Sequence, residues 1–292
     1  MRTLTITLLA LLLAGGEAAA QQAINERIST SPTGEVEIHN LSGSVRVSAW
    51  NRNEVQVTGT LGQGAERLEI TPEGNRVRIR VILPREARNV RGTDLEIRVP
   101  ARRDLNVRTV SANIDVTEVQ GNVQARSVSG QVRVGGNSQS IDAESVSGNV
   151  EISANTPHVR AKTVSGRLRL SGVRGSADLS TVSGDTELEG GRFARLQFKS
   201  VSGDLRFRGD LERNGIYNLE SHSGGLELRL PRATAADFDV RTFSGRITNE
   251  FGPDPERTSR HAPGYELRFT AGNGGAMVTA RSFSGSVKLL RQ

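Results

Sequence analysis

One tetrapeptide recurs through the second half of the chain and constrains the fold more than any other feature. It reads Ser or Thr, then Val, Phe or His, then Ser and Gly, and a variant beginning at Thr109 ends in Ala112. Its last positions are Ala112, Gly130, Gly148, Gly166, Gly184, Gly203, Gly224, Gly245 and Gly285, with spacings of 18, 18, 18, 18, 19, 21, 21 and 40 residues. Such a period is typical of a solenoid, in which each repeat packs on its neighbours.

The last spacing predicts two coils. Glu266-Leu267-Arg268-Phe269 resembles the segment that follows each tetrapeptide, and it would place Tyr265 in the glycine position. With this division, the series from Thr109 onward contains about ten coils.

Each coil predicts two short strands. Apolar and polar residues alternate before the tetrapeptide, as in Val123–Arg126, and again after it, as in Gln131–Val134. This alternation is typical of strands with one buried face. The alternation changes phase across Ser127 and Val128, so the chain must bend there, and the nearby glycine suits a close backbone approach. The fold class is therefore all-β: a single-chain parallel β-solenoid of about ten 18–21-residue coils with a β-rich N-terminal cap.

Two columns of residues support in-register stacking. The inward column is Val107, Ala125, Ala143, Ala161, Leu179, Phe198, Leu219 and Val240. The outward column, three residues past the glycine position, is Asp115, Arg133, Glu151, Arg169, Glu187, Arg206 and Glu227. Since stacked coils lie about 4.8 Å apart, strict alternation of charge pairs each residue with two opposite charges and specifies the register.

The sequence divides into three parts. Residues 1–20 predict a secretory signal, with Arg2 before the apolar stretch Leu4–Ala14 and a small-residue cleavage site at Ala18–Ala20. An uncleaved anchor helix is the alternative. Residues 21–108 predict a β-rich cap that contains a coil-like segment over Glu35–Val47, with its glycine at Gly43, and a hairpin around Gly74. Residues 109–292 predict the solenoid repeats, with an insertion loop over 251–264.

We expect a periplasmic or secreted protein with no transmembrane segment after signal cleavage, because no later stretch approaches about 20 apolar residues. The chain has no cysteine, so its stability cannot depend on disulfides. Its formal charge of +6 is not gathered into runs, and nucleic acid is not an expected partner.

The segment EVEIHNLSGSVRVSAWNRNEVQVT over Glu35–Thr58, together with the later SVSG coils, resembles the bacterial putative-adhesin family of β-strand-repeat envelope proteins. The resemblance implies the solenoid fold and a binding role at the cell envelope. It implies no catalytic residues.

Catalytic and metal-binding chemistry find little support in the sequence. The serines of the tetrapeptide are too numerous to be nucleophiles, and no Gly-x-Ser-x-Gly elbow precedes a helix. The four histidines lack ligand spacing, and they are His39, His158, His222 and His261. We therefore predict no catalytic residues, no metal site and no cofactor, and the binding residues stay open.

Three functions remain. The first is a non-enzymatic, adhesin-like scaffold whose partner is an envelope component, a glycan or a protein. The second is a carbohydrate-active solenoid enzyme, because Asp185 and Asp204 share an outward column and could lie about 5 Å apart, as in a retaining glycosidase, or hold calcium. The third is electrostatic binding of an anionic envelope polymer by arginines of the cap, namely Arg85, Arg88, Arg91, Arg102 and Arg103. We favour the scaffold, since nearby arginines can simply neutralise both acids.

Overall fold

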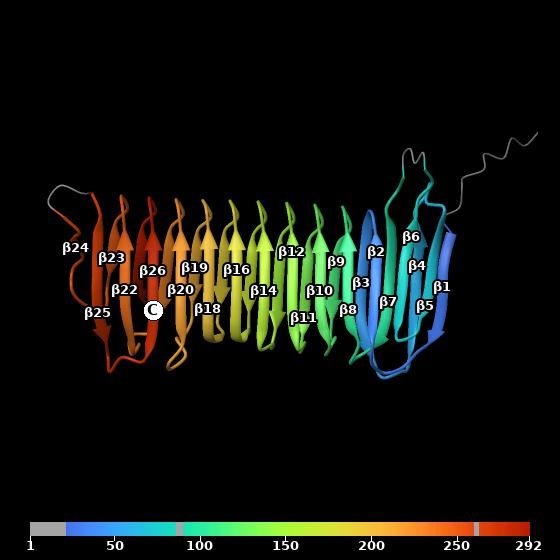
Figure 1. Cartoon of the computed structure of the whole chain (residues 1–292), viewed down its shortest axis with the longest axis horizontal. Coiled ribbons are helices and arrows are strands. Elements are labelled where there is room, and N and C mark those ends of the chain that lie inside the picture. Colours follow the sequence, from blue (N-terminus) through green and yellow to red (C-terminus); the bar gives the residue numbers. More distant parts are fainter. Residues whose placement is uncertain (1–21, 86–89, 260–262) are drawn as a thin grey trace, which may run out of the picture.

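The structure, a computed structural model, describes residues 22–85, 90–259 and 263–292. The signal sequence predicted over residues 1–20 lies outside this part of the chain. The described residues form strands and turns, and none of them belongs to a helix that could span a membrane. Figure 1 shows a straight rod in which two long sheets face each other, with the N-terminal strands at one end and the C-terminal strands at the other.

The first sheet has 13 strands. In spatial order they are β1 (Gln22–Ser29), β4 (Glu54–Leu61), β7 (Thr93–Pro100), β3 (Gly43–Trp50), β9 (Asn113–Thr117), β11 (Val132–Gly136), β13 (Val150–Ala154), β15 (Leu168–Ser171), β17 (Thr186–Glu189), β19 (Leu205–Arg208), β21 (Leu226–Leu230), β27 (Val287–Arg291) and β23 (Ile247–Asn249).

The second sheet has 14 strands. In spatial order they are β24 (Glu256–Arg257), β25 (Tyr265–Ala271), β22 (Ala236–Thr242), β26 (Ala276–Ser282), β20 (Ile216–Ser221), β18 (Arg192–Ser200), β16 (Arg174–Thr181), β14 (His158–Thr163), β12 (Ser140–Ser145), β10 (Asn122–Ser127), β8 (Asp104–Thr109), β2 (Glu35–Asn40), β6 (Arg76–Ile82) and β5 (Arg67–Glu73).

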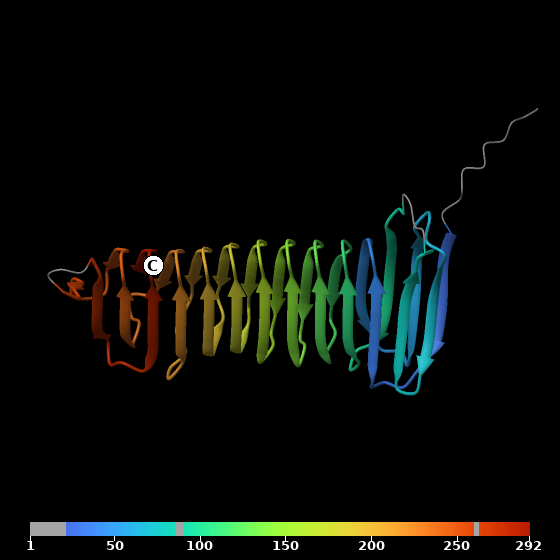
Figure 2. The same cartoon turned by 45° about the horizontal axis from the view of Figure 1, so that its top comes forward.

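Each coil contributes one strand to each sheet. Setting aside the antiparallel strands β1, β4, β5, β24 and β25 leaves eleven parallel strands per sheet among the described residues. The predicted all-β parallel solenoid is confirmed. Figure 2 shows the two layers of strands along the stack.

The interior is filled by the inward-facing residues of both sheets. The predicted inward column from Val107 to Val240 is at most 1% exposed. It is alanine in three 18-residue coils, Leu179 in the last 18-residue coil and Phe198 in the 19-residue coil, so larger side chains fill the interior as it widens.

The tetrapeptide shapes the bend between the two strands. Its first hydroxyl is buried and accepts a hydrogen bond from the glycine N–H three residues later, for example 2.8 Å from Gly130 N to Ser127 Oγ and 3.0 Å from Gly166 N to Thr163 Oγ1. The Ser145 hydroxyl also donates to the Gly130 carbonyl of the preceding coil, at 3.1 Å. The repeated hydroxyls therefore satisfy buried backbone groups at the turn.

The glycines allow neighbouring coils to approach. A Cβ added at Gly166 would lie 2.0 Å from the carbonyl oxygen of Gly148, and one at Gly184 would lie 1.7 Å from that of Gly166. No side chain fits at these distances, so the repeat needs glycine for space rather than for an unusual φ.

The charged outward column is longer in space than in the sequence. Register partners continue the alternation to Glu96 and Arg46 at one end and to Lys288 at the other. Ion pairs join Arg133 to Glu151 at 3.3 Å and Arg169 to Glu187 at 2.7 Å. Each exposed pair contributes little stability, but a one-residue slip would break all of them together.

The C-terminal coils are not in chain order, and the coil predicted at Tyr265 is wrong. β25 runs antiparallel to β22, with Tyr265 opposite Thr242. The last coil, β26 and β27, lies between β20–β21 and β22–β23 instead (Figure 1). In that position Lys288 is the register partner of Glu227, and its Nζ is 3.9 Å from the carboxylate. If the coils followed chain order, β23 would lie there and would place the uncharged Thr248 beside Glu227.

The segment predicted as the cap, 21–108, contains two coils of the parallel stack. β2–β3 packs on β8–β9, and β6–β7 packs outside β2–β3. The strands β1, β4 and β5 run antiparallel at this end, so they cover the edges of the stack. After β3 the chain forms the antiparallel strands β4 and β5 and the outer coil β6–β7 before it reaches β8 on the other side of β2–β3, which explains the irregular gap before Ala112.

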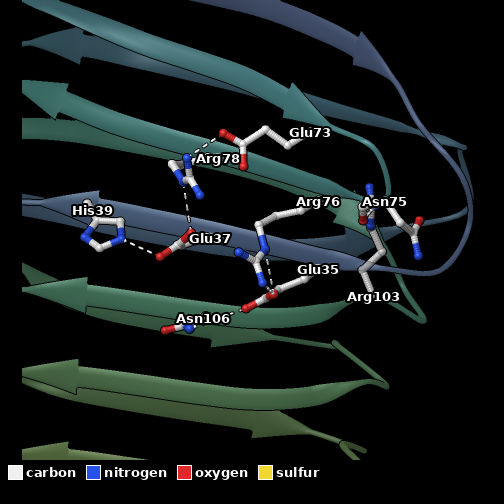
Figure 3. A network of polar contacts seen from close by, with 9 residues as sticks. All are labelled: Glu35, Glu37, His39, Glu73, Asn75, Arg76, Arg78, Arg103 and Asn106. Atoms are coloured by element: carbon white, nitrogen blue, oxygen red, sulfur yellow. Dashed lines mark hydrogen bonds and ion pairs between the residues drawn. The ribbon is translucent and has the colours of Figure 1, made fainter.

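A polar network joins these N-terminal coils (Figure 3). Glu37 accepts hydrogen bonds from His39 at 2.9 Å and from Arg78 at 3.1 Å. The His39 hydrogen bond, opposed by burial and aided by Arg78, lowers the pKa of Glu37 from 4.5 to about 2. Arg103, only 1% exposed, donates to Thr30 and to the Asn75 carbonyl at 2.6 Å, and burial lowers its pKa.

We expect Gly166→Ala to destabilise the solenoid by about 1–3 kcal/mol, because its Cβ would overlap the carbonyl of the preceding coil. The matched control is Gly135→Ala, since a Cβ there meets its nearest neighbour at an ordinary 3.6 Å. Urea unfolding followed by circular dichroism measures both. Equal stability of the two variants would show that close approach does not explain the repeated glycine.

The lowered pKa of Glu37 predicts that the stability of the protein depends on pH. Its folded-state pKa is depressed, so its contribution is complete above pH 4.5 and is lost as the pH falls towards 2. Glu37→Gln should therefore be less stable than the wild type at pH 6, with the difference shrinking between pH 4.5 and 2. Urea titrations across this range test it, with exposed Glu26→Gln as the control. A difference that does not change with pH would contradict the assignment.

Candidate functional site

A line of exposed apolar side chains runs along one edge of the rod, the bend edge, where each coil turns from the second sheet to the first at its tetrapeptide. They occupy the second position of each tetrapeptide, and all but His222 are large apolar residues that are 40–51% exposed. In spatial order this bend ladder consists of Leu41, Val110, Val128, Val146, Val164, Val182, Val201, His222, Phe283 and Phe243.

Local geometry forces these side chains outward. The preceding Ser or Thr is buried and bonded to the glycine N–H, so the next residue at the bend faces solvent. Backbone bonds hold each position beside its neighbour, as where Val146 N donates to the Val128 carbonyl at 3.2 Å and Ser147 N donates to it at 2.9 Å. Parallel, in-register stacking thus turns one repeat position into a continuous apolar line.

The C-terminal end of the bend ladder is aromatic. The rings of His222 and Phe283 stack with centroids 4.9 Å apart and planes 2° apart, and those of Phe283 and Phe243 stack at 4.7 Å and 7°. The stack exists because the last coil of the chain lies between two coils that are consecutive in the sequence, which places Phe283 between His222 and Phe243.

A shallow groove of about 690 Å³ lies beside this stack. The ring edges form its apolar part, and hydroxyls of the second sheet and the segment near Thr258 form the rest. Its charged lining residues are Lys199, Glu220, Arg241 and Arg281.

Those charges belong to a column that precedes the bend ladder by two residues in each coil. In spatial order this basic column is Arg80, His39, Arg108, Arg126, Glu144, Lys162, Ser180, Lys199, Glu220, Arg281 and Arg241. Seven of its eleven members are Lys or Arg and two are acidic. Unlike the alternating column of the first sheet, it presents a surplus of positive charge.

The column that adjoins the bend ladder on its other side is uncharged. The third position of the tetrapeptide is an exposed serine in each coil of the series that follows Leu41. These residues are Ser111, Ser129, Ser147, Ser165, Ser183, Ser202, Ser223, Ser284 and Ser244.

Asp185 and Asp204 lie in adjacent coils, as predicted, but their oxygens already have structural partners. Asp185 Oδ1 accepts the N–H of Asp204 at 3.2 Å, and Asp204 Oδ1 accepts that of Gly225 at 2.7 Å. Asn113 and Asn149 make the same contact to the coil that follows each of them, at 2.9 Å. Arg206 lies 3.8 Å from both aspartates. This arrangement links coils and needs an acceptor oxygen rather than an acid.

The other predicted candidates do not form a site. His39 contacts Glu37, His222 belongs to the bend ladder, and His261 lies outside the described residues. Within the residues that the structure describes, no three acidic or histidine side chains are grouped so that they could hold a metal ion. Of the cap arginines, Arg103 is buried and cannot bind a polymer at the surface, and Arg88 lies outside the described residues.

The bend ladder was not predicted as a site. The sequence does contain a feature that points to it, because the second position of the tetrapeptide is Val, Phe or His and never a charged residue. Apolar residues in a repeat are usually assigned to the core, and only the bend geometry shows that these ones face solvent.

No curated protein matches the chain. A crystal structure of a putative adhesin from Bacteroides fragilis is 10% identical, with a TM-score of 0.46 over 92% of this chain and 97% of that chain. A putative lipid binding protein from Parabacteroides distasonis is 12% identical, with a TM-score of 0.45 over 91% and 96%.

The Toastrack DUF4097 family model matches residues 28–290, which cover both the N-terminal coils and the repeats. This match agrees with the family resemblance indicated by the SVSG coils. The chain belongs to the Toastrack DUF4097 family.

Proposed function

We propose that the protein is an exported, non-enzymatic, adhesin-like scaffold that binds a component of the cell envelope through the bend ladder. The observation that carries this proposal is the line of half-exposed Val, Leu and Phe side chains, in which His222 is the one member that is not apolar. Contiguous exposed apolar surface of this extent is unusual on a soluble protein and usually marks a binding surface.

The dimensions of the bend ladder suit an extended partner. Ten positions at about 4.8 Å per coil span roughly 43 Å. No single position contributes much contact area, so affinity depends on many coils acting together. A rigid solenoid supports such binding because its coils hold the side chains in line before the partner arrives.

The alternatives draw weaker support from the structure. The proposed glycosidase acids both serve as acceptors for the next coil, a role that asparagine fills elsewhere. The proposed arginine cluster of the cap loses Arg103 to the interior. We therefore favour a scaffold whose apolar contacts persist at high salt.

Replacing Val128, Val146 and Val164 by Ser should reduce co-sedimentation of residues 21–292 with isolated cell envelopes by tenfold or more at both low and high salt. The change removes apolar contact, while exposed substitutions alter folding stability by less than about 0.5 kcal/mol each. The matched control is Arg133→Gln with Glu151→Gln, which removes an exposed ion pair from the other sheet. If all these proteins are retained equally, the bend ladder is not the binding surface.

Asp185→Asn and Asp204→Asn should leave stability and envelope binding unchanged, because an amide oxygen accepts the same N–H. Asp204→Ala should cost about 1 kcal/mol, since it leaves the Gly225 N–H without its partner. Thermal unfolding and a polysaccharide turnover assay test this together. Turnover by the wild type that the Asn variants abolish would instead establish the enzyme.

A further inference from the structure

We propose that the partner of the bend ladder is the surface of an anionic lipid bilayer, on which the rod lies lengthwise. This inference rests on the proposed function and goes further, because it names the chemistry of the partner. It is carried by the shape of the edge, the charge beside it and the aromatic stack at its end.

The edge is convex. Its apolar side chains project from the bends, and the buried Ser or Thr hydroxyls lie behind them. A protein partner would need a groove that matches a repeat of about 4.8 Å over the whole length, whereas a fluid bilayer accommodates a straight row of protruding side chains. Apolar residues held at the boundary between headgroups and acyl chains are the usual means of interfacial attachment.

The basic column supplies the electrostatic component. It follows the bend ladder along the rod, with seven Lys or Arg residues against Glu144 and Glu220. Glu144 lies 3.2 Å from Arg126 and 3.6 Å from Lys162, and seven basic residues against two acidic ones leave the column with five surplus positive charges. The surplus positive charge is therefore adjacent to the apolar line, where it would meet phosphate headgroups as the apolar side chains enter the bilayer.

The C-terminal end combines both features most strongly. Phe243 and Phe283 are the largest exposed side chains of the bend ladder, and Arg241 and Arg281 are register partners beside them. The groove of about 690 Å³ is lined by these four residues and by Lys199. Rings next to paired arginines suit a phosphate headgroup with its acyl chain, so we expect this end to bind first.

A second copy of the chain fits the edge less well. Two copies packed antiparallel through the bend ladder would place their basic columns against each other. Packed parallel, they would place a basic column against the uncharged serines. Neither arrangement supplies the negative charge that the basic column requires.

The test uses residues 21–292 and vesicles made from purified lipids. Sedimentation with phosphatidylglycerol–phosphatidylcholine vesicles should retain the protein, and phosphatidylcholine alone should retain at least tenfold less. Raising the salt should weaken retention without abolishing it, because the apolar contacts remain. Tryptophan is not near the edge, so a fluorescent label at Ser129→Cys would report burial at the bilayer boundary.

Two double variants separate the contributions. Phe243→Ser with Phe283→Ser should lower retention on anionic vesicles by at least tenfold. Lys199→Gln with Arg281→Gln should lower it by about fivefold per charge. The matched control is Arg174→Gln with Arg192→Gln, an exposed register pair at the other end of the strands of the second sheet, which should change it less than twofold.

The outcomes are distinguishable. Retention on isolated envelopes with none on anionic vesicles would overturn the lipid assignment and leave the proposed function standing. Equal loss in the charge variant and its control would mean that net charge, not the bend edge, drives binding, and would also overturn it. Light scattering that shows a dimer dispersed by the Phe variants, without vesicle binding, would identify a second copy as the occupant.

Discussion

The structure depends on one contact that recurs at seven bends, where a Ser or Thr hydroxyl accepts the glycine N–H of its own coil. Because that glycine has no Cβ, the carbonyl oxygen of the preceding coil can lie within about 2 Å of where a side chain would begin. Together these features set the distance between coils and the direction of the chain at the turn. This contact therefore sets the spacing between successive residues in every column along the rod.

In-register stacking gives each repeat position a single role along the whole rod. The column three residues past the glycine alternates in charge and helps to hold the coils together. The column before the bend departs from alternation and carries surplus positive charge beside the apolar line. The charges of the alternating column balance one another, whereas those of the basic column do not. The basic column is therefore suited to a partner of opposite charge.

The order of the coils along the rod differs from the chain order at both ends. β6–β7 lies outside β2–β3, and β26–β27 returns to lie inside β22–β23. The second exchange builds the aromatic stack, because Phe283 then lies between His222 and Phe243. The most distinctive part of the candidate surface thus depends on a contact between segments that are distant in the sequence.

The sequence by itself determined the repeat, the strands, the buried column from Val107 to Val240 and the alternating charges, since all of these follow from periods within and between coils. It could not show whether Val128 and its equivalents face inward or outward, because the alternation breaks at the bend and either phase is compatible with an apolar residue. Nor could it place Phe283, because a gap of 40 residues is compatible with two successive coils or with a hairpin and a returning coil. Only the tertiary structure decided these points, through the hydroxyl bond that turns the bend residue outward and the charge and packing that seat the last coil beside Glu227.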